Sequence, residues 1–209
     1  MSDADDVIKA EWPDVPPVEN PLEAIDMAQD FIAFVLNVFA AIQGGAISPG
    51  SFANDTTFRS ASGSVRIRTR YSEGSLKGRA WNLLFSAIAI TSQAVDRALL
   101  DALGKRPLEG KAAAAIDALA DLDAAWALVY MIRCAFAHDP FNPRWECRGR
   151  YLGTLRVAAL NLTVDLRARN GQRLQPDEFG GLGGYMRLLQ FLQGELQARL
   201  HGEGAKGAQ

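Results

Sequence analysis

The chain is most informative at residues 130–140, which read YMIRCAFAHDP. They close a pattern rich in alanine and leucine, whose apolar residues recur at helical spacing and predict a long helix over 108–138. Pro140 ends this helix, because a proline pushes the residue before it out of the α region. Arg133 and His138 therefore stand at a helix end, which is rigid on one side and open on the other.

Three further helices are predicted by the same spacing and by their end signals. Asn20 and Pro21 fit the N-cap and the first helical position, because an Asn side chain bonds free N–H groups and Pro lacks one. Gly104 ends another helix, since glycine readily adopts the conformation of a C-terminal cap. The helix at 108–138 is expected to break near Asp121. The other expected helices cover 21–43, 76–103 and 182–201.

Extended structure is predicted in two places. Residues 160–166 alternate in strand fashion, and the Asn-Gly pair at 170–171 signals a tight turn, so we expect a small antiparallel ribbon, with residues 145–147 as a further candidate segment. A long loop covers 44–74 and holds one short extended piece at 65–71. The expected fold class is mainly α: an up-and-down helical bundle with a small antiparallel β ribbon near the C-terminal third.

Composition divides the chain into an arm, one domain and a tail. Residues 1–20 combine three prolines with acidic side chains and predict an acidic flexible arm. Residues 21–201 are expected to form a single helical domain, because 209 residues with 48% apolar content can bury one sizeable core. The glycine-containing residues 202–209 are expected to be a disordered tail.

Charge and cysteine content bear on the expected partners and on the cellular compartment. The net charge of −2 does not indicate a nucleic-acid binder, but basic segments within an acidic chain keep an anionic partner open. Two cysteines make no disulfide framework, and the acidic start shows no signal peptide, so we expect a cytoplasmic protein. The apolar run 31–42 is twelve residues long. A bilayer span needs about 20, so we expect no membrane association.

The Arg-x4-His spacing in residues 132–140, IRCAFAHDP, resembles the signature of the HEPN superfamily, and the match is best over 125–145. Members are small helical domains, and many are metal-independent endoribonucleases. The resemblance implies an HEPN-like endoribonuclease without a cofactor, acting as a toxin or defence effector. It implies catalytic roles for Arg133 and His138, and an antitoxin or a nucleotidyltransferase-like protein as partner.

RNA cleavage suits these two residue types. RNA carries its own nucleophile, the 2′-hydroxyl. His138 can accept or donate that proton near neutral pH, and the Arg133 guanidinium can stabilise a pentavalent phosphorane without a metal. On an ideal helix the two side chains diverge by about 140°. They converge only if the helix end unwinds or a second copy faces the first, so we expect a homodimer.

The alternative is a catalytically inactive HEPN-like module that binds a nucleotide, RNA or a protein partner. Family members that cut RNA usually carry a small polar residue such as Asn after the arginine, whereas this chain has Cys134. In the plainest structural interpretation, Arg133 pairs with an acid such as Asp139, and His138 caps the helix C-terminus, where a cation is favoured.

Two arginine-rich segments predict a rim that holds RNA phosphates. Tyr71 lies beside the first segment and Trp145 beside the second, where each could stack on a base. The simpler interpretation is a solvated strand face with core aromatic residues. The residues expected to bind RNA or phosphate are Arg66, Arg68, Arg70, Arg144, Arg148 and Trp145.

Two weaker patterns point to other ligands. Cys134 and His138 have helical metal-ligand spacing, and Cys147 could add a third ligand. A small buried hydrophobe is the favoured role for Cys134, so we expect no metal. The glycines at 180–184 precede a helix and could offer N–H groups to a phosphate, but they lack the Gly-Lys-Ser/Thr ending of a P-loop. A hinge or close packing is the favoured interpretation.

Overall fold

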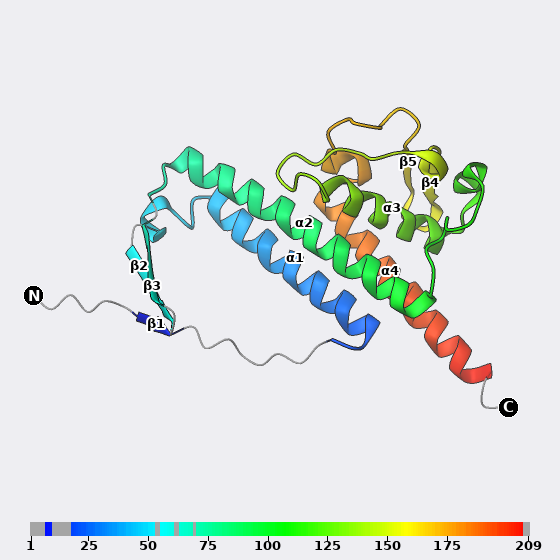
Figure 1. The fold of residues 1–209 in the computed structure, drawn as a ribbon, viewed down its shortest axis with the longest axis horizontal. Helices are drawn as coiled ribbons and strands as arrows, with labels where there is room; N and C mark the ends of the chain where they lie inside the picture. The colour runs from blue at the N-terminus through cyan, green and yellow to red at the C-terminus, as the bar shows by residue number, and fades with distance from the viewer. Residues whose placement is uncertain (1–6, 10–17, 53–54, 61–62, 69, 207–209) are drawn as a thin grey trace, which may run out of the picture. The chain divides into compact units, whose positions relative to one another are not determined.

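The computed structural model describes residues 7–9, 18–52, 55–60, 63–68 and 70–206. This described part is mainly helical, as expected, with two small β-sheets (Figure 1). The α-helices are α1 (Pro21–Gln43), α2 (Glu73–Leu103), α3 (Asp121–Phe136) and α4 (Gly181–Lys206). The strands are β1 (Val7–Lys9), β2 (Asp55–Ser60), β3 (Gly63–Arg68), β4 (Thr154–Val157) and β5 (Leu162–Asp165). The 3-10 helices are η1 (Pro49–Phe52), η2 (Ala113–Ala118), η3 (Gly149–Tyr151), η4 (Ala158–Leu160) and η5 (Pro176–Phe179).

The chain forms two compact units. The first contains Met1–Pro17 and Val35–Leu84, and the second contains Val18–Phe34 and Phe85–Gln209. The helices α1 and α2 contribute a part to each unit. The single domain expected over 21–201 is thus shared between the units, and the whole motif at 130–140 belongs to the second.

In the first unit, the last turns of α1 and the first turns of α2 share a small apolar core. Ile42 of α1 and Leu76 and Ala80 of α2 are at most 5% exposed there. The rings of Phe39 and Trp81 meet edge to face beside them, with centroids 4.7 Å apart. Such aromatic pairs contribute about 0.5–1.5 kcal/mol beyond their buried area, so they help to hold the two helices together.

The first unit also holds a three-stranded sheet in the order β1-β2-β3, with β1 parallel to β2 and β2 antiparallel to β3. The extended piece expected at 65–71 coincides with most of β3. The pattern misses β2, because its six residues contain one large apolar side chain and so give almost no alternation. The expected arm at 1–20 contains β1, and most of the rest of that arm lies outside the described residues.

In the second unit, α3 is enclosed on nearly all sides, since eleven of its sixteen residues are buried. Polar contacts fix its neighbours. Trp126 of α3 donates its indole N–H to Asp96 of α2 at 3.0 Å. The hydroxyl of Tyr185 on α4 lies 2.8 Å from that of Thr91 and 2.7 Å from that of Ser92 on α2. Satisfied polar contacts inside a core select one packing register, so α2 is the common support of α3 and α4.

Several predicted helix ends are confirmed. The side chain of Asn20 accepts the N–H of Leu22 at 3.0 Å, and Gly104 follows α2 with a φ of +81°. The break expected near Asp121 is present, since α3 begins there. The expectation of one long helix before that break is wrong, because the preceding segment is the short 3-10 helix η2. The helix α4 continues to Lys206, so most of the tail expected to be disordered is helical.

The expected ribbon is present, with β4 antiparallel to β5, but its turn is elsewhere. The two strands are joined through η4 and Asn161, which has a left-handed φ of 50°. The Asn-Gly pair at 170–171 forms a separate turn, in which Gln172 N–H bonds the Arg169 carbonyl at 2.8 Å. Residues 145–147 lie outside the ribbon. The ribbon turns at Asn161, because Asn tolerates the left-handed region. The Asn-Gly pair does form a turn, but outside the ribbon.

Two helices, α1 and α2, are long and apolar enough to cross a bilayer by length and composition alone. The twelve-residue run at 31–42 is too short by itself, but the helix that contains it has 23 residues. Half of the apolar window in α2 is buried within the protein, against 28% in α1. A buried core helix passes the same test, so this is a weak indication of a membrane span.

The glycines at the start of α4 provide a test of the packing. A Cβ atom on Gly184 would overlap the carbonyl oxygen of Phe179, whereas Gly183 has open space around it. We expect Gly184→Ala to lower the free energy of unfolding by about 1–3 kcal/mol. The control Gly183→Ala should leave it unchanged or raise it by up to about 1 kcal/mol. Urea denaturation measures both, and equal values for the two variants would contradict close packing at Gly184.

Candidate active site

A buried carboxylate organises the region around the motif. Asp96 lies on α2 and is 2% exposed. It accepts two hydrogen bonds from Arg106, from Nε at 3.0 Å and Nη2 at 2.8 Å, and one from the indole of Trp126 at 3.0 Å. A bidentate guanidinium matches the geometry of a carboxylate, and the indole fills a further lone pair. The charge of Asp96 is thereby compensated inside the core.

Arg133, the motif arginine, belongs to the same network. Its Nε lies 3.8 Å from Asp96 Oδ2, and its guanidinium lies over the ring of Tyr130 at 5.8 Å. Arg133 thus pairs with an acid, as in the plainest structural interpretation, but that acid is Asp96 and not Asp139. Asp139 instead accepts the backbone N–H groups of Phe141 and Asn142 at 3.0 and 3.1 Å, which shapes the turn after the helix.

His138, the motif histidine, lies beyond the helix. The helix α3 ends at Phe136, and the cap N–H of Ala137 donates to the carbonyl of Cys134 at 3.1 Å. The helix thus ends before Pro140, which meets one of the two alternative conditions given above for convergence of the motif side chains. His138 is 79% exposed, and its Nε2 lies 2.9 Å from Glu146 Oε1.

Glu146 is held in place by its neighbours. It stands between Trp145 and Cys147, each 1% exposed. The N–H of Trp145 bonds the carbonyl of Gln172 at 2.9 Å, and the N–H of Arg144 bonds the carbonyl of Ala135 in α3 at 3.1 Å. The segment that carries Glu146 is therefore tied to the end of the motif helix, so the carboxylate reaches His138 from a fixed position.

A cavity of about 350 Å³ opens beside the motif, and we name it the motif cavity. His138 is not among the described residues that line it, but it lies between Ala137 and Pro140, which are. The structure thus brings Arg133 into the cavity and the backbone of His138 to its edge. The lining residues are Ala89, Ile90, Gln93, Arg133, Phe136, Ala137 and Pro140.

The thiol of Cys134 lies within the same group of charges. Burial raises its pKa, the charge of Arg133 lowers it, and the charge of Glu146 raises it. The thiol therefore stays protonated at neutral pH and is a poor nucleophile and a poor metal ligand.

The described residues contain no group of three or more His, Cys, Asp or Glu side chains placed to hold a metal ion. Cys147, considered as a third ligand with Cys134 and His138, is 1% exposed. Burial raises the pKa of the Cys147 thiol to about 11, which disfavours the thiolate that a metal requires.

The residues expected to form the RNA rim are divided between the two units. Trp145 is wrong as a stacking residue, because its ring is enclosed in the core and its indole N–H donates to Glu178 at 2.6 Å. Arg144 and Arg148 are exposed in the second unit, where Arg144 also bonds the carbonyl of Gly171 at 2.9 Å. The other three candidates belong to the first unit. Arg66 and Arg70 are exposed there, and the side chain of Arg68 lies outside the described residues.

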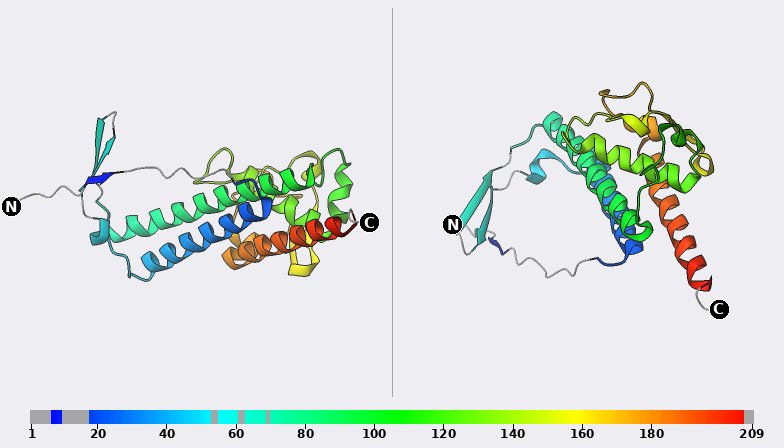
Figure 2. Two further views of the ribbon diagram at one scale, coloured as in Figure 1. Left: turned by 90° about the horizontal axis from the view of Figure 1, so that it is seen from below. Right: turned by 45° about the vertical axis from the view of Figure 1, so that its right-hand side comes forward.

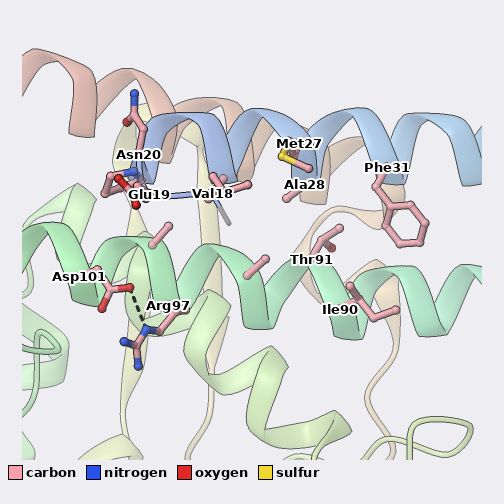
Figure 3. A pocket seen from close by; sticks show the side chains of 14 residues that line it. Val18, Glu19, Asn20, Met27, Ala28, Phe31, Ile90, Thr91, Arg97 and Asp101 are labelled. Atoms are coloured by element: carbon pink, nitrogen blue, oxygen red, sulfur yellow. Dashed lines mark hydrogen bonds and ion pairs between the residues drawn. The ribbon is translucent and has the colours of Figure 1, made fainter. Parts of the chain in front are cut away.

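An apolar groove lies between α1 and α2 in the second unit (Figure 3). Figure 2 shows these two helix segments running side by side. The groove has a volume of about 370 Å³. Met27 and Ile90 in its lining are 50% and 55% exposed, and an ion pair between Arg97 and Asp101, 2.8 Å long, lies at its edge. Ile90 also lines the motif cavity, so the two hollows are adjacent.

Comparison of the chain with protein-family models, with curated proteins and with solved structures found no match.

Sequence reasoning missed Asp96, Arg106 and Glu146. Asp96 lies between Val95 and Leu99, both buried, so its position on the apolar face of α2 is a usable signal of a buried charge. Its partners gave no signal, because they stand 10 and 30 residues further along the chain.

The Asp96 network predicts a large difference between two arginine substitutions. Arg106→Ala should lower the free energy of unfolding by about 2–4 kcal/mol, because it leaves a buried carboxylate poorly compensated. Arg97→Ala removes an exposed pair with Asp101 and should cost less than about 1 kcal/mol. Urea denaturation of both variants measures the difference. Similar losses would show that Asp96 does not depend on Arg106.

Proposed function

We propose that this protein is a metal-independent endoribonuclease of HEPN type, with Arg133 and His138 as its catalytic residues. The observation that supports the proposal best is the exposed histidine held by Glu146 at the edge of a cavity that contains Arg133. An accessible imidazole oriented by a carboxylate is suited to proton transfer, and a guanidinium in a cavity is suited to an anionic transition state.

In the proposed reaction, His138 accepts the proton of the ribose 2′-hydroxyl, and the 2′ oxygen attacks the adjacent phosphorus. Arg133 stabilises the negative charge of the phosphorane, and the bond from phosphorus to the 5′ oxygen then breaks. A proton from the imidazolium neutralises that leaving oxygen. The products are a 2′,3′-cyclic phosphate and a 5′-hydroxyl end, and no metal or cofactor takes part.

The surroundings give each group a role. Glu146 fixes the orientation of the imidazole through the contact of its Oε1 with Nε2. Gln93, exposed in the motif cavity, offers an amide to a base. Arg144 and Arg148 would hold neighbouring phosphates, which adds affinity but little sequence selectivity.

The proposed active form is a homodimer that joins through the apolar groove, since a second copy there would stand beside the motif cavity. The groove is self-complementary: Arg97 of one copy can pair with Asp101 of the other across a two-fold axis. The face made by α1 and α2 measures about 20 Å by 20–25 Å, from the helix lengths and a helix spacing of about 10 Å. Two such faces bury about 800–1,000 Å², near the lower limit of about 1,000 Å² for a specific interface.

The proposed setting is the cytoplasm, without membrane association. The HEPN-like motif suggests a toxin or defence effector controlled by an antitoxin or a nucleotidyltransferase-like partner. These assignments rest on the resemblance at residues 125–145 and on the absence of a disulfide framework.

A binding module without cleavage is the second candidate. Two observations favour it: Cys134 replaces the small polar residue usual after the arginine, and Arg133 already interacts with Asp96. The negative charge of Asp96 offsets part of the charge that Arg133 would offer to a transition state, while the guanidinium can still attract a phosphate.

The catalytic proposal predicts unequal roles for the two histidines. His138→Ala should lower the rate of RNA cleavage by about 10²–10⁴-fold, since a general acid–base group contributes that much. His201→Ala is the matched control, because His201 is exposed on α4 and is outside the motif. Cleavage of a labelled RNA in EDTA measures both. Cleavage by His138→Ala at the parent rate would remove this histidine from the mechanism.

The dimer proposal predicts that light scattering gives a mass of twice 22.6 kDa at micromolar concentration. Met27→Glu should produce a monomer, because it places a charge in the apolar groove. Leu152→Glu is the control: Leu152 is 45% exposed in the same unit but does not line the groove. A monomeric parent protein would contradict the proposal. If that monomer bound lipid vesicles, the apolar groove would be assigned to contact with a bilayer instead.

A further inference from the structure

We propose that a second cavity near the motif binds a nucleoside monophosphate, with its phosphate on Arg150 and Arg106 and its base against Tyr151. This tyrosine cavity has a volume of about 250 Å³ and is distinct from the motif cavity. Its lining residues are Arg106, Glu109, Tyr130, Arg150 and Tyr151. The proposal is independent of whether the protein cuts RNA.

Three elements hold the lining side chains in place. Arg106 follows α2 and directs Nε and Nη2 to Asp96, so its plane is fixed and further N–H groups remain for a ligand. Arg150 in η3 is anchored by one bond, from Nη1 to the carbonyl of Leu108 at 2.8 Å. Both guanidiniums are therefore preorganised, which lowers the entropy lost when a ligand binds.

Two tyrosine rings supply the aromatic side of the cavity. The rings of Tyr130 and Tyr151 have centroids 5.3 Å apart, and the Arg106 guanidinium lies 4.8 Å over Tyr130. Burial raises the pKa of both phenols, so they remain uncharged and do not repel a phosphate. Tyr151 can offer its ring to a base, a contact worth about 1–3 kcal/mol in proteins that bind single strands.

Charge and volume limit the ligand to one phosphate. The lining contains Arg106, Arg150 and Glu109. Asp96, which pairs with Arg106, and Arg133, which pairs with Asp96, add one charge of each sign, so the net charge is about +1. That charge suits a monophosphate better than a triphosphate. The volume of about 250 Å³ has room for a phosphate and part of a nucleoside. The carboxylate of Glu109 can accept the ribose hydroxyls.

The test uses isothermal titration calorimetry on the full chain carrying His138→Ala. This variant is chosen so that cleavage of a dinucleotide ligand cannot affect the measured heat. Adenosine monophosphate should bind at least tenfold more tightly than adenosine or inorganic phosphate. A dinucleotide with a 5′-phosphate then distinguishes the end of an RNA from a free nucleotide: equal affinity identifies an RNA end, and loss of affinity identifies a free nucleotide.

Variants locate the site. Arg150→Ala and Tyr151→Leu should each weaken binding of adenosine monophosphate at least tenfold, and Tyr151→Phe, which keeps the ring, should weaken it less than threefold. Arg199→Ala, at an exposed position on α4, should leave the affinity unchanged. Because Arg150→Ala also breaks a bond to Leu108, its melting curve is measured, and Arg150→Lys serves as a second variant with the charge kept. Absence of binding at millimolar nucleotide, or equal affinity in Tyr151→Leu and the parent, would overturn the proposal.

Discussion

Asp96 places a negative charge inside the second unit, where a lone carboxylate would be too costly to keep ionised. Its hydrogen bonds come from an arginine after α2 and an indole on α3. A second arginine, Arg133, adds its charge at 3.8 Å. Satisfying this carboxylate therefore fixes how α2, the segment after it and α3 meet. Apolar packing alone would leave α3 freer to slide, because its surface is apolar nearly all round.

The same carboxylate connects structure to function. It holds Arg133 at the motif cavity and Arg106 at the tyrosine cavity, so one buried charge positions two guanidiniums that face different hollows. His138 depends on a separate support, the backbone around the buried Trp145 that carries Glu146. The arginine and the histidine are thus positioned by separate supports, one from α2 and one from the segment around Trp145.

The long helices were predictable because their signals are local. Asn20 caps α1 and Gly104 ends α2, and neither depends on a distant residue. Pairing across the chain was not predictable in the same way. Glu146 gives no signal in the sequence, because it is one acid among several arginines. Its contact with His138 depends on backbone bonds to distant segments, which a pattern in one sequence does not specify. The proposed stacking role of Trp145 relied on its charged neighbours, whereas the simpler interpretation, a core aromatic residue, holds: its indole is paired with Glu178 in the core.

The chemical identity of the RNA ends tests the central claim most directly. If His138 and Arg133 promote attack by the 2′-hydroxyl, mass spectrometry of RNA digested in EDTA will show 2′,3′-cyclic phosphate and 5′-hydroxyl ends. Ends with a 3′-hydroxyl and a 5′-phosphate would show attack by water on the phosphate and contradict the account.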